Sequence, residues 1–468
     1  MRIPYMKKNA VYPLSNELAA SALHADKRIA EAKHLLNEAV SDHQKRINGV
    51  RPPIGSLKQS YKELLESMEA YRGGKLWFPF LGSGFGKGAL VELADGSVKY
   101  DFICGIGVHF WGHSHLDLLD AAIDAALSDT IMQGNLQQNI DSVELSALLA
   151  KSSGLPHCFL TTSGAMANEN ALKVAFQKHY PAKRILAFEQ CFAGRTLTLS
   201  QITDKAAFRE GLPHNAFVDY VPFFDAAFPE ESTKRAVETL KKYIARYPKE
   251  HALMCFEFIL GEGGFYAGNE DFFKALMQIL KENHIAIFAD EVQSFGRTQE
   301  LFAFQKFNLQ SYIDIASIGK LSQVCATFFT SEYKPKPGLL SQTFTGSTSA
   351  IKSALVILDG LLNDGYFGPE GKIQKLHLHF SKQLEALSKR YPHLIQGPFG
   401  VGCMVAFTPY DGSPEKVTDF VHRLFNAGVM GFIAGKNPTR VRFLIPAGAL
   451  TLEDIDNAMK IIEQTLIL

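Results

Sequence analysis

The sequence predicts an α/β protein with a mainly parallel main sheet that helices cover on both faces. From about Pro156, short apolar segments of strand length alternate with helical segments. This alternation continues for ~190 residues, as expected of a largely parallel sheet. Of the 468 residues, 46% are hydrophobic, which is enough for a large core. Ligands of such sheets bind beyond the carboxyl ends of the strands, so the residues after each strand are the candidate functional residues.

Residues 1–75 are predicted to form an N-terminal helical extension. One helical stretch runs from Asp26 to Val40, and Pro52-Pro53 separates it from a second. The second carries one apolar stripe with helical spacing, made of Leu57, Tyr61, Leu64, Leu65 and Met68. A stripe of this kind favours a docking face rather than a ligand site.

The glycine-rich segment Gly82–Gly88 resembles a phosphate-binding loop but fits neither common template. A Walker loop needs Ser or Thr after the lysine, and here Gly88 follows Lys87. A dinucleotide loop opens a helix, whereas Ala89–Leu93 alternates and leads into Asp95-Gly96, a hairpin turn signal. The segment therefore predicts the entry to a β-hairpin and argues against a nicotinamide-dependent oxidoreductase.

The main sheet and a smaller α+β domain follow in order along the chain. Candidate strands are Cys158–Thr161, Ile185–Phe188, Leu253–Phe258, Ala286–Ala289, Ile313–Ser317 and Ala326–Thr330, with helices such as Ala165–Gln177 and Phe272–Asn283 between them. Further strand-like pieces are Phe399–Phe407 and Arg440–Leu444. We expect residues 76–110 and 351–468 to build the smaller domain and residues 111–350 the large one.

Charge and cysteine usage exclude several classes of protein. With 48 basic and 48 acidic residues, the chain lacks the cationic surplus of a general nucleic-acid binder or a polybasic membrane-surface protein. No apolar segment approaches the ~20 residues that span a bilayer, and no secretory h-region follows Lys7 and Lys8. Six scattered cysteines lack the spacing of a zinc site. We expect a cytoplasmic protein with no structural metal, no membrane and no nucleic-acid partner.

Candidate functional residues follow three of the predicted strands. Ser163, Gly164 and Ala165 follow the first strand and open a helix, where backbone N–H groups can approach an anion. Taken alone, Ser163 is equally compatible with an ordinary N-cap. Asp290 follows the fourth strand and Lys320 follows the fifth. An ion pair closing the sheet edge would explain both, and so would a nucleophilic amine and a carboxylate facing one ligand.

An anion cradle, an amine nucleophile and an opposing acid are together what pyridoxal 5'-phosphate requires. The cradle would hold the phosphate, Lys320 would form a Schiff base with the aldehyde, and Asp290 would keep the pyridine nitrogen protonated. Phe192, after the second strand, could stack on the ring. These residues indicate the cofactor.

An ordered set of motifs over about residues 76–465 resembles the class III aminotransferases. The motifs are Tyr100–Ile106, Gly112–His115, Ser163–Lys173, Gly194-Arg195-Thr196, Gly261–Gly264, Asp290–Gln293, Gly319-Lys320 and Val441–Leu444. The resemblance implies the fold of type I pyridoxal-phosphate transferases. That fold has a large domain with a seven-stranded type of sheet between helices, and a smaller domain built from the N- and C-terminal parts.

The resemblance also implies roles at matching positions. Lys320 and Asp290 would be the catalytic residues, Gln293 would bond the ring hydroxyl, and Thr343 would reach the phosphate of a neighbouring subunit in a homodimer. Arg195 and Arg442 match two arginines that hold substrate carboxylates. Glu262 would mask Arg442 while a mono-carboxylate donor binds, and would swing away for 2-oxoglutarate.

The substrate stays open because the chain departs from the family around its pocket. Ala193 replaces an aromatic residue or histidine, Gln137-Gln138 replaces an aromatic pair, and Thr345-Gly346-Ser347 replaces a Gly-Gly-Asn segment. Leu321–Cys325 is similar to the matching segment of lysine 6-aminotransferases. We expect transfer from a terminal amine, as in lysine, ornithine, acetylornithine or 4-aminobutyrate, to 2-oxoglutarate. The alternatives are an aminomutase or decarboxylase on the same fold, or a non-catalytic paralogue.

Overall fold

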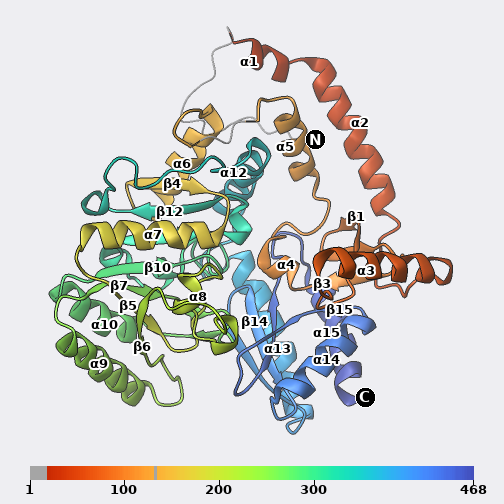
Figure 1. Ribbon diagram of the computed structural model, residues 1–468. Helices are drawn as coiled ribbons and strands as arrows, with labels where there is room; N and C mark the ends of the chain where they lie inside the picture. The colour runs from red at the N-terminus through yellow and green to blue at the C-terminus, as the bar shows by residue number, and fades with distance from the viewer. Residues whose placement is uncertain (1–17, 131–133) are drawn as a thin grey trace.

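The computed structural model describes residues 18–130 and 134–468. The larger of its two parts is built around a seven-stranded sheet (Figure 1). The strand order is β4-β12-β11-β10-β7-β5-β6. The strands are β4 (His157–Thr161), β5 (Arg184–Phe188), β6 (Phe217–Val221), β7 (His251–Phe256), β10 (Ala286–Asp290), β11 (Ile315–Ile318) and β12 (Cys325–Phe329). Only β12 runs antiparallel to its neighbours in this sheet, so the predicted mainly parallel sheet is confirmed.

The sequence analysis missed the edge strand β6. Its central Asp219 breaks the apolar run, but it accepts hydrogen bonds from Arg184 Nε and from His251 Nε2, both at 2.8 Å. Burial alone would raise the pKa of Asp219, yet these two partners lower it to about 2. The buried charge of Asp219 is therefore stabilised by hydrogen bonds from residues of neighbouring strands, which meet it only in the folded sheet.

Helices pack against this sheet mainly through apolar side chains. The helix α7 (Gly164–Lys178) crosses the front of the sheet in Figure 1, and α10 (Glu270–Glu282) begins at the cap Asn269. The buried rings of Phe272 and Phe273 on α10 lie 5.3 Å apart, and Phe272 lies 5.8 Å from Phe188 of β5. Aromatic packing thus fixes α10 on the strands whose ends carry the candidate site.

Chain segments from both ends build the smaller part of the molecule. One sheet joins β1 (Gly82–Lys87), β2 (Leu90–Leu93) and β3 (Val98–Asp101) to β15 (Val429–Met430). Another has the order β13-β14-β17-β16, with β13 (Ile395–Val401), β14 (Met404–Pro409), β16 (Phe432–Ala434) and β17 (Arg440–Leu444). The helices α13 (Lys372–Arg390), α14 (Pro414–Ala427) and α15 (Leu452–Ile467) lie with them in Figure 1. The exact domain boundaries stay a prediction.

Two local expectations for this part met different outcomes. The strands β2 and β3 pair antiparallel across Asp95-Gly96, so the predicted hairpin is confirmed. The segment Gly82–Lys87, expected only as the entry to this hairpin, is itself the strand β1 and pairs with β2. A single strand over Phe399–Phe407 is wrong, because β13 and β14 fold back on each other there. The turn contains Gly402 at φ +58°, where a side-chain Cβ would lie 2.0 Å from the carbonyl oxygen of Arg297. Only glycine fits so close an approach of two backbones.

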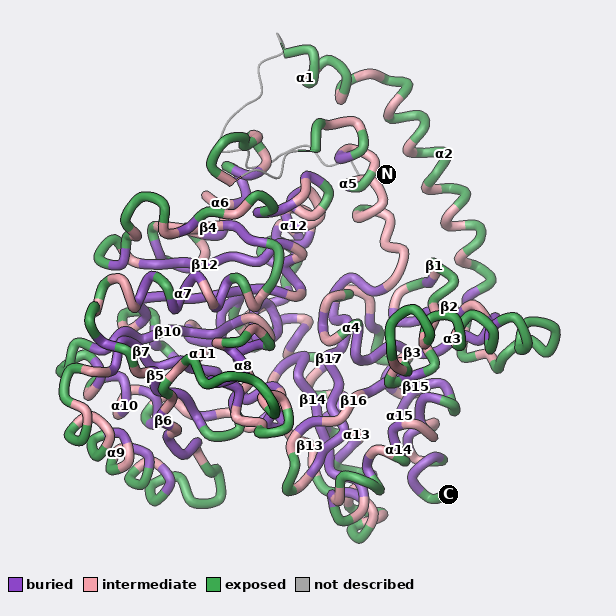
Figure 2. Tube along the Cα trace, in the orientation of Figure 1, coloured by how far each residue is buried: buried purple, intermediate pink, exposed green. Residues whose placement is uncertain are grey.

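Residues 1–17 of the predicted N-terminal extension lie outside the described residues. From residue 18 on, the structure has α1 (Ala19–His24), α2 (Lys27–Gln44) and α3 (Lys58–Arg72), so the two predicted helical stretches are present. Lys33 Nζ on α2 lies 2.5 Å from Asp124 Oδ1 on α5 (Leu116–Ala126). Most of α3 is exposed (Figure 2). Within the apolar stripe, Tyr61 is buried and hydrogen-bonds the Pro79 carbonyl oxygen, and Leu65 is half-buried, whereas Leu57, Leu64 and Met68 are exposed. Only part of the stripe therefore packs against the described part of this chain.

The remaining longer helices are α6 (Ile140–Ser153), α9 (Pro229–Arg246) and α12 (Thr348–Asn363), and the short ones are α4 (Cys104–Gly107), α8 (Leu199–Ile202) and α11 (Ala303–Lys306). The strands β8 (Ile259–Leu260) and β9 (Tyr266–Ala267) form a separate two-stranded sheet. None of the helices within residues 18–130 and 134–468 combines the length and the apolar character needed to cross a bilayer. Over the same residues, no cluster of His, Cys, Asp or Glu is arranged to hold a metal ion.

Candidate active site

The predicted site residues gather where the strands of the main sheet end. Asp290 ends β10 and pairs in register with Ser317 of the neighbouring β11. Lys320 lies two residues beyond β11, in a short 3-10 helix (Lys320–Ser322), at φ +57°. A positive φ is uncommon for a residue with a side chain and is typical of constrained functional positions. The fold therefore brings the acid and the amine to one sheet edge.

Asp290 is a buried carboxylate held by defined donors. Its Oδ2 accepts a 2.7 Å hydrogen bond from Asn168 Nδ2, and its Oδ1 accepts one of 3.1 Å from the Val292 backbone. Ser317 donates a 2.6 Å bond to Asn168 Oδ1, which fixes the orientation of that amide. Burial raises the pKa of Asp290 to about 6 against the opposing effects of these bonds and of Lys320. At neutral pH this carboxyl is thus mostly ionised.

The amine of Lys320 is tuned toward its neutral form. Burial lowers its pKa to about 8 and outweighs the attraction of Asp290, while Arg442 lowers the pKa further. A primary amine with such a pKa is partly unprotonated near neutrality and can act as a nucleophile.

The residues after β4 form the N-terminus of α7. Ser163 is the N-cap and its Oγ accepts a 3.1 Å hydrogen bond from the Met166 backbone, so the structural role considered for it is confirmed. The first backbone N–H groups of a helix have no partner within the helix, and those of Gly164 and Ala165 belong to this set. A Cβ at Gly164 would lie 2.6 Å from Val292 Cγ1, which shows how closely α7 approaches the loop after β10.

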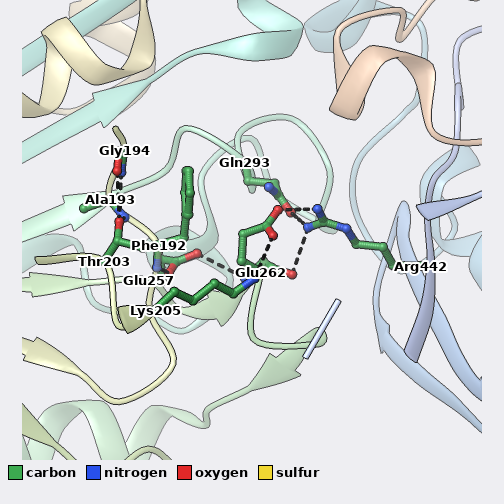
Figure 3. A network of polar contacts seen from close by, with 10 residues as sticks. Phe192, Ala193, Gly194, Thr203, Lys205, Glu257, Glu262, Gln293 and Arg442 are labelled. Atoms are coloured by element: carbon green, nitrogen blue, oxygen red, sulfur yellow. Dashed lines mark hydrogen bonds and ion pairs between the residues drawn. The ribbon is translucent and has the colours of Figure 1, made fainter. Parts of the chain in front are cut away.

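The predicted pairing of Glu262 with Arg442 is present (Figure 3). Arg442 lies on β17 with no exposed surface, and its Nη2 donates to Glu262 Oε1. Its Nη1 donates to the carbonyl oxygen of Gly261 at 3.0 Å and to Gln293 Oε1 at 3.3 Å. Burial would raise the pKa of Glu262, but Arg442 and Lys205 together lower it.

Arg195 stands apart from this pair and is exposed. Its Cζ lies 3.8 Å from the ring centroid of Phe208 and 5.8 Å from that of Phe192. Over residues 18–130 and 134–468 its guanidinium makes no ion pair, so its charge is available to a ligand. One arginine is thus masked and the other is open.

Comparison with known proteins identifies the family. The model of the aminotransferase class-III family matches residues 83–466. The chain is 30% identical over 380 residues to an acetylornithine aminotransferase of Methanocaldococcus jannaschii, covering 77% of this chain and 87% of that protein. It is 31% identical to acetylornithine aminotransferase 1 of Bradyrhizobium diazoefficiens, covering 78% and 87%. The chain belongs to the class III aminotransferases. It is therefore a transaminase, of a family that uses pyridoxal phosphate.

Solved structures agree with this class III aminotransferase in fold. A lysine aminotransferase from M. tuberculosis, solved in the internal aldimine form, superposes with a TM-score of 0.77 at 21% identity, covering 86% of this chain and 99% of that one. An ornithine aminotransferase from Toxoplasma gondii ME49 gives 0.75 at 21% identity, covering 87% and 95%. The predicted type I transferase fold is confirmed.

Three residues of this aminotransferase site were not singled out from the sequence. Asn168 orients Asp290, Lys205 contacts Glu262, and Glu257 is a second buried acid after β7. Burial, reinforced by Asp290, raises the pKa of Glu257 to about 8. Its carboxyl accepts backbone hydrogen bonds from Phe192 at 2.7 Å and Gly261 at 3.0 Å, so it joins two site loops. The predicted strand Leu253–Phe258 included Glu257, whereas β7 ends at Phe256 and places this acid directly after the strand.

Two predicted roles remain predictions. Gln293 accepts from Arg442, and a bond to a ring hydroxyl would use its amide nitrogen. Thr343 is exposed beside Gln342, whose Oε1 accepts a 2.5 Å bond from Thr161 at the end of β4. An exposed threonine at this position suits a contact with a second subunit.

The donor set fits pyridoxal phosphate. A buried carboxylate, a primary amine with a lowered pKa and a helix N-terminus converge on one strand edge. These match the pyridine nitrogen, the aldehyde and the phosphate, respectively.

Proposed function

We propose that this protein transfers the terminal amine of an amino acid to 2-oxoglutarate, producing glutamate. The observation that carries the proposal is the pair of arginines, Arg442 masked by Glu262 and Arg195 open. A donor with one carboxylate needs one arginine, and 2-oxoglutarate needs two. A guanidinium grips a carboxylate through two parallel N–H bonds, which a lysine cannot reproduce.

The chain's residues supply the groups that would hold the cofactor. Lys320 would bind the aldehyde, Asp290 the pyridine nitrogen and Gln293 the ring hydroxyl, with Phe192 against the ring. Ser163, Gly164, Ala165 and the partner subunit's Thr343 would bind the phosphate, so we infer a homodimer with shared sites. When bound, pyridoxal phosphate accepts electrons from the substrate carbon and carries the amino group between substrates.

The protein's own contribution is positioning and proton transfer. Lys320 Nζ, once free, would move a proton at the amine-bearing carbon of the donor, which its lowered pKa permits near neutral pH. Asp290 holds negative charge where the cofactor nitrogen would carry positive charge, and Asn168 keeps that carboxylate aimed. Glu257 fastens the loop of Phe192 to that of Gly261.

The names of the relatives support the proposed donor class. Acetylornithine is the substrate in the names of the two relatives compared above, and lysine and ornithine occur in the names of the solved structures. All three carry a terminal amine and a carboxylate. Ala193, buried beside Phe192, is smaller than the aromatic residue or histidine of many family members, which supports a longer donor chain. No observation favours an aminomutase or a decarboxylase.

The test is a donor panel with 2-oxoglutarate, with glutamate formation as the readout. We expect turnover with at least one of acetylornithine, ornithine, lysine and 4-aminobutyrate. Arg195→Lys keeps the charge but loses the planar fork, so it should raise the KM of the active donor. If no terminal amine yields glutamate, the proposal is wrong.

A further inference from the structure

Lys205 is a second cation on the carboxylate that masks Arg442. It lies in the loop after α8, and its Nζ is 3.3 Å from Glu262 Oε2, whereas Arg442 holds Oε1 (Figure 3). Each oxygen of Glu262 therefore has its own positively charged partner. The Glu262 side chain is only 16% exposed, so water does little to stabilise its charge.

Lys205 also lies between the two substrate arginines. Its Nζ is 5.1 Å from the ring centroid of Phe208, and the same ring carries Arg195 at 3.8 Å. The structure thus contains a series of contacts from the open arginine to the masked one, Arg195–Phe208–Lys205–Glu262–Arg442.

The loop that carries Lys205 is fastened independently of Arg442. Thr203 Oγ1 accepts hydrogen bonds from the backbones of Ala193 at 3.0 Å and Gly194 at 3.3 Å, and it donates to the Gly194 carbonyl oxygen at 3.0 Å (Figure 3). The backbone N–H of Asp204 bonds to the Cys191 carbonyl oxygen at 3.0 Å. Lys205 therefore keeps its place when Glu262 leaves Arg442.

We propose that Lys205 is the positioning residue that receives Glu262 when Arg442 is freed for the second carboxylate of the acceptor. This inference rests on the proposed function, because it assumes that Arg442 binds 2-oxoglutarate. A buried carboxylate that loses its last positively charged partner is strongly destabilised. With Lys205 present, Glu262 has two positively charged partners in the masked state and keeps one when it leaves Arg442. Without Lys205, Glu262 has Arg442 alone in the masked state and loses it on opening.

The direction of the mutational effect follows from this difference. In Lys205→Met, the masked state keeps the Arg442–Glu262 pair, but the open state loses the second cation that forms an ion pair with Glu262 among the described residues. The variant should therefore favour the masked state and weaken the binding of dicarboxylates alone. A mono-carboxylate binds at Arg195 and does not need Glu262 to move.

The experiment measures binding without turnover. Calorimetry on the protein loaded with pyridoxal phosphate compares glutarate, an unreactive dicarboxylate, with pentanoate, the monocarboxylate of the same chain length. For Lys205→Met we expect the glutarate Kd to rise about tenfold, within the usual range of coupling between two sites. The pentanoate Kd should change less than about twofold, and Lys205→Arg should restore glutarate binding. Lys281→Met, which removes a lysine–Asp314 pair elsewhere, is the matched control and should change neither.

Three results would overturn the inference. An unchanged or lower glutarate Kd in Lys205→Met excludes a role in opening. Equal weakening of both ligands assigns Lys205 to support of Phe208 and Arg195. A full Lys205→Met effect in a Glu262→Gln background shows that it does not act through Glu262. If the wild type binds glutarate no tighter than pentanoate, the two-arginine acceptor site itself fails, and with it the proposed function.

Discussion

Asn168 Nδ2 donates 2.7 Å hydrogen bonds both to Asp290 Oδ2 and to the carbonyl oxygen of Ala193. One buried amide thus connects α7, the end of β10 and the loop after β5. Ser317 fixes its other face through a 2.6 Å bond to Oδ1. The acid proposed to hold the cofactor nitrogen is consequently oriented by Asn168.

Asn168→Ala should weaken cofactor binding. The change removes a donor from a buried carboxylate, and hydrogen bonds to charged groups contribute about 1.5–3 kcal/mol, so we expect a rise of roughly tenfold or more in the Kd for pyridoxal phosphate. Fluorescence titration of the apo protein measures it. Asn170→Ala is the matched control, because Asn170 is equally buried on the same helix and its Nδ2 has no partner within the described residues. Similar losses in both variants would contradict the assignment.

Capture of the cofactor by the apo protein should accelerate as pH rises through about 8. Only the unprotonated amine of Lys320 is a nucleophile, and burial lowers its pKa to about 8. Asp290, with a pKa of about 6, is already mostly ionised around pH 8, where Lys320 loses its proton. Stopped-flow mixing with pyridoxal phosphate between pH 6 and 9.5 gives the midpoint. Because Asp290 raises the pKa of Lys320, Asp290→Asn should move the midpoint to lower pH, and a shift to higher pH would refute the coupling.

Arg442→Ala should impair use of 2-oxoglutarate more than use of the amine donor. It removes a buried charged partner of the acceptor, a change that typically costs about 2–5 kcal/mol in binding. Steady-state kinetics should show a large rise in the KM for 2-oxoglutarate. Arg442→Lys retains charge without the fork and should recover only part of the loss. Unchanged kinetics with 2-oxoglutarate in Arg442→Ala would remove Arg442 from the acceptor site.

Subunit contact is predicted around Thr343. Phe344 next to it is 58% exposed and Leu136 is 81% exposed, an apolar pair suited to burial against a second copy. Sedimentation should give a dimer, and Phe344→Asp should shift it toward monomer with weaker cofactor binding. Thr343→Ala should keep the dimer but raise the Kd for pyridoxal phosphate by about tenfold. A monomer that binds the cofactor fully would exclude shared sites.

The acid and the amine of the candidate site could be predicted because each directly follows an apolar strand in the sequence. Asp290 and Lys320 directly follow apolar strands, and a parallel sheet brings such ends to one edge. Glu262 and Arg442 could be paired only through family resemblance, since 180 residues separate them and no local pattern links them.

The residues that were missed depend on tertiary neighbours. Asp219 makes β6 look unlike a strand until Arg184 and His251 neutralise it. Lys205 lies in a polar loop, where a lysine is ordinarily a solvated surface residue, and its contact with Glu262 exists only in the folded chain. The apolar side chains of α3 show the reverse case: their spacing predicted the helix correctly, but Leu64 and Met68 are exposed.

Lys320 is the amine proposed to bind the cofactor, and a covalent label tests this most directly. Incubation with pyridoxal phosphate, reduction with borohydride and peptide mass spectrometry would locate the covalent adduct. We predict one pyridoxyl group on Lys320, and none on the Lys320→Ala variant. An adduct on another lysine, or no adduct on the wild type, would contradict the account.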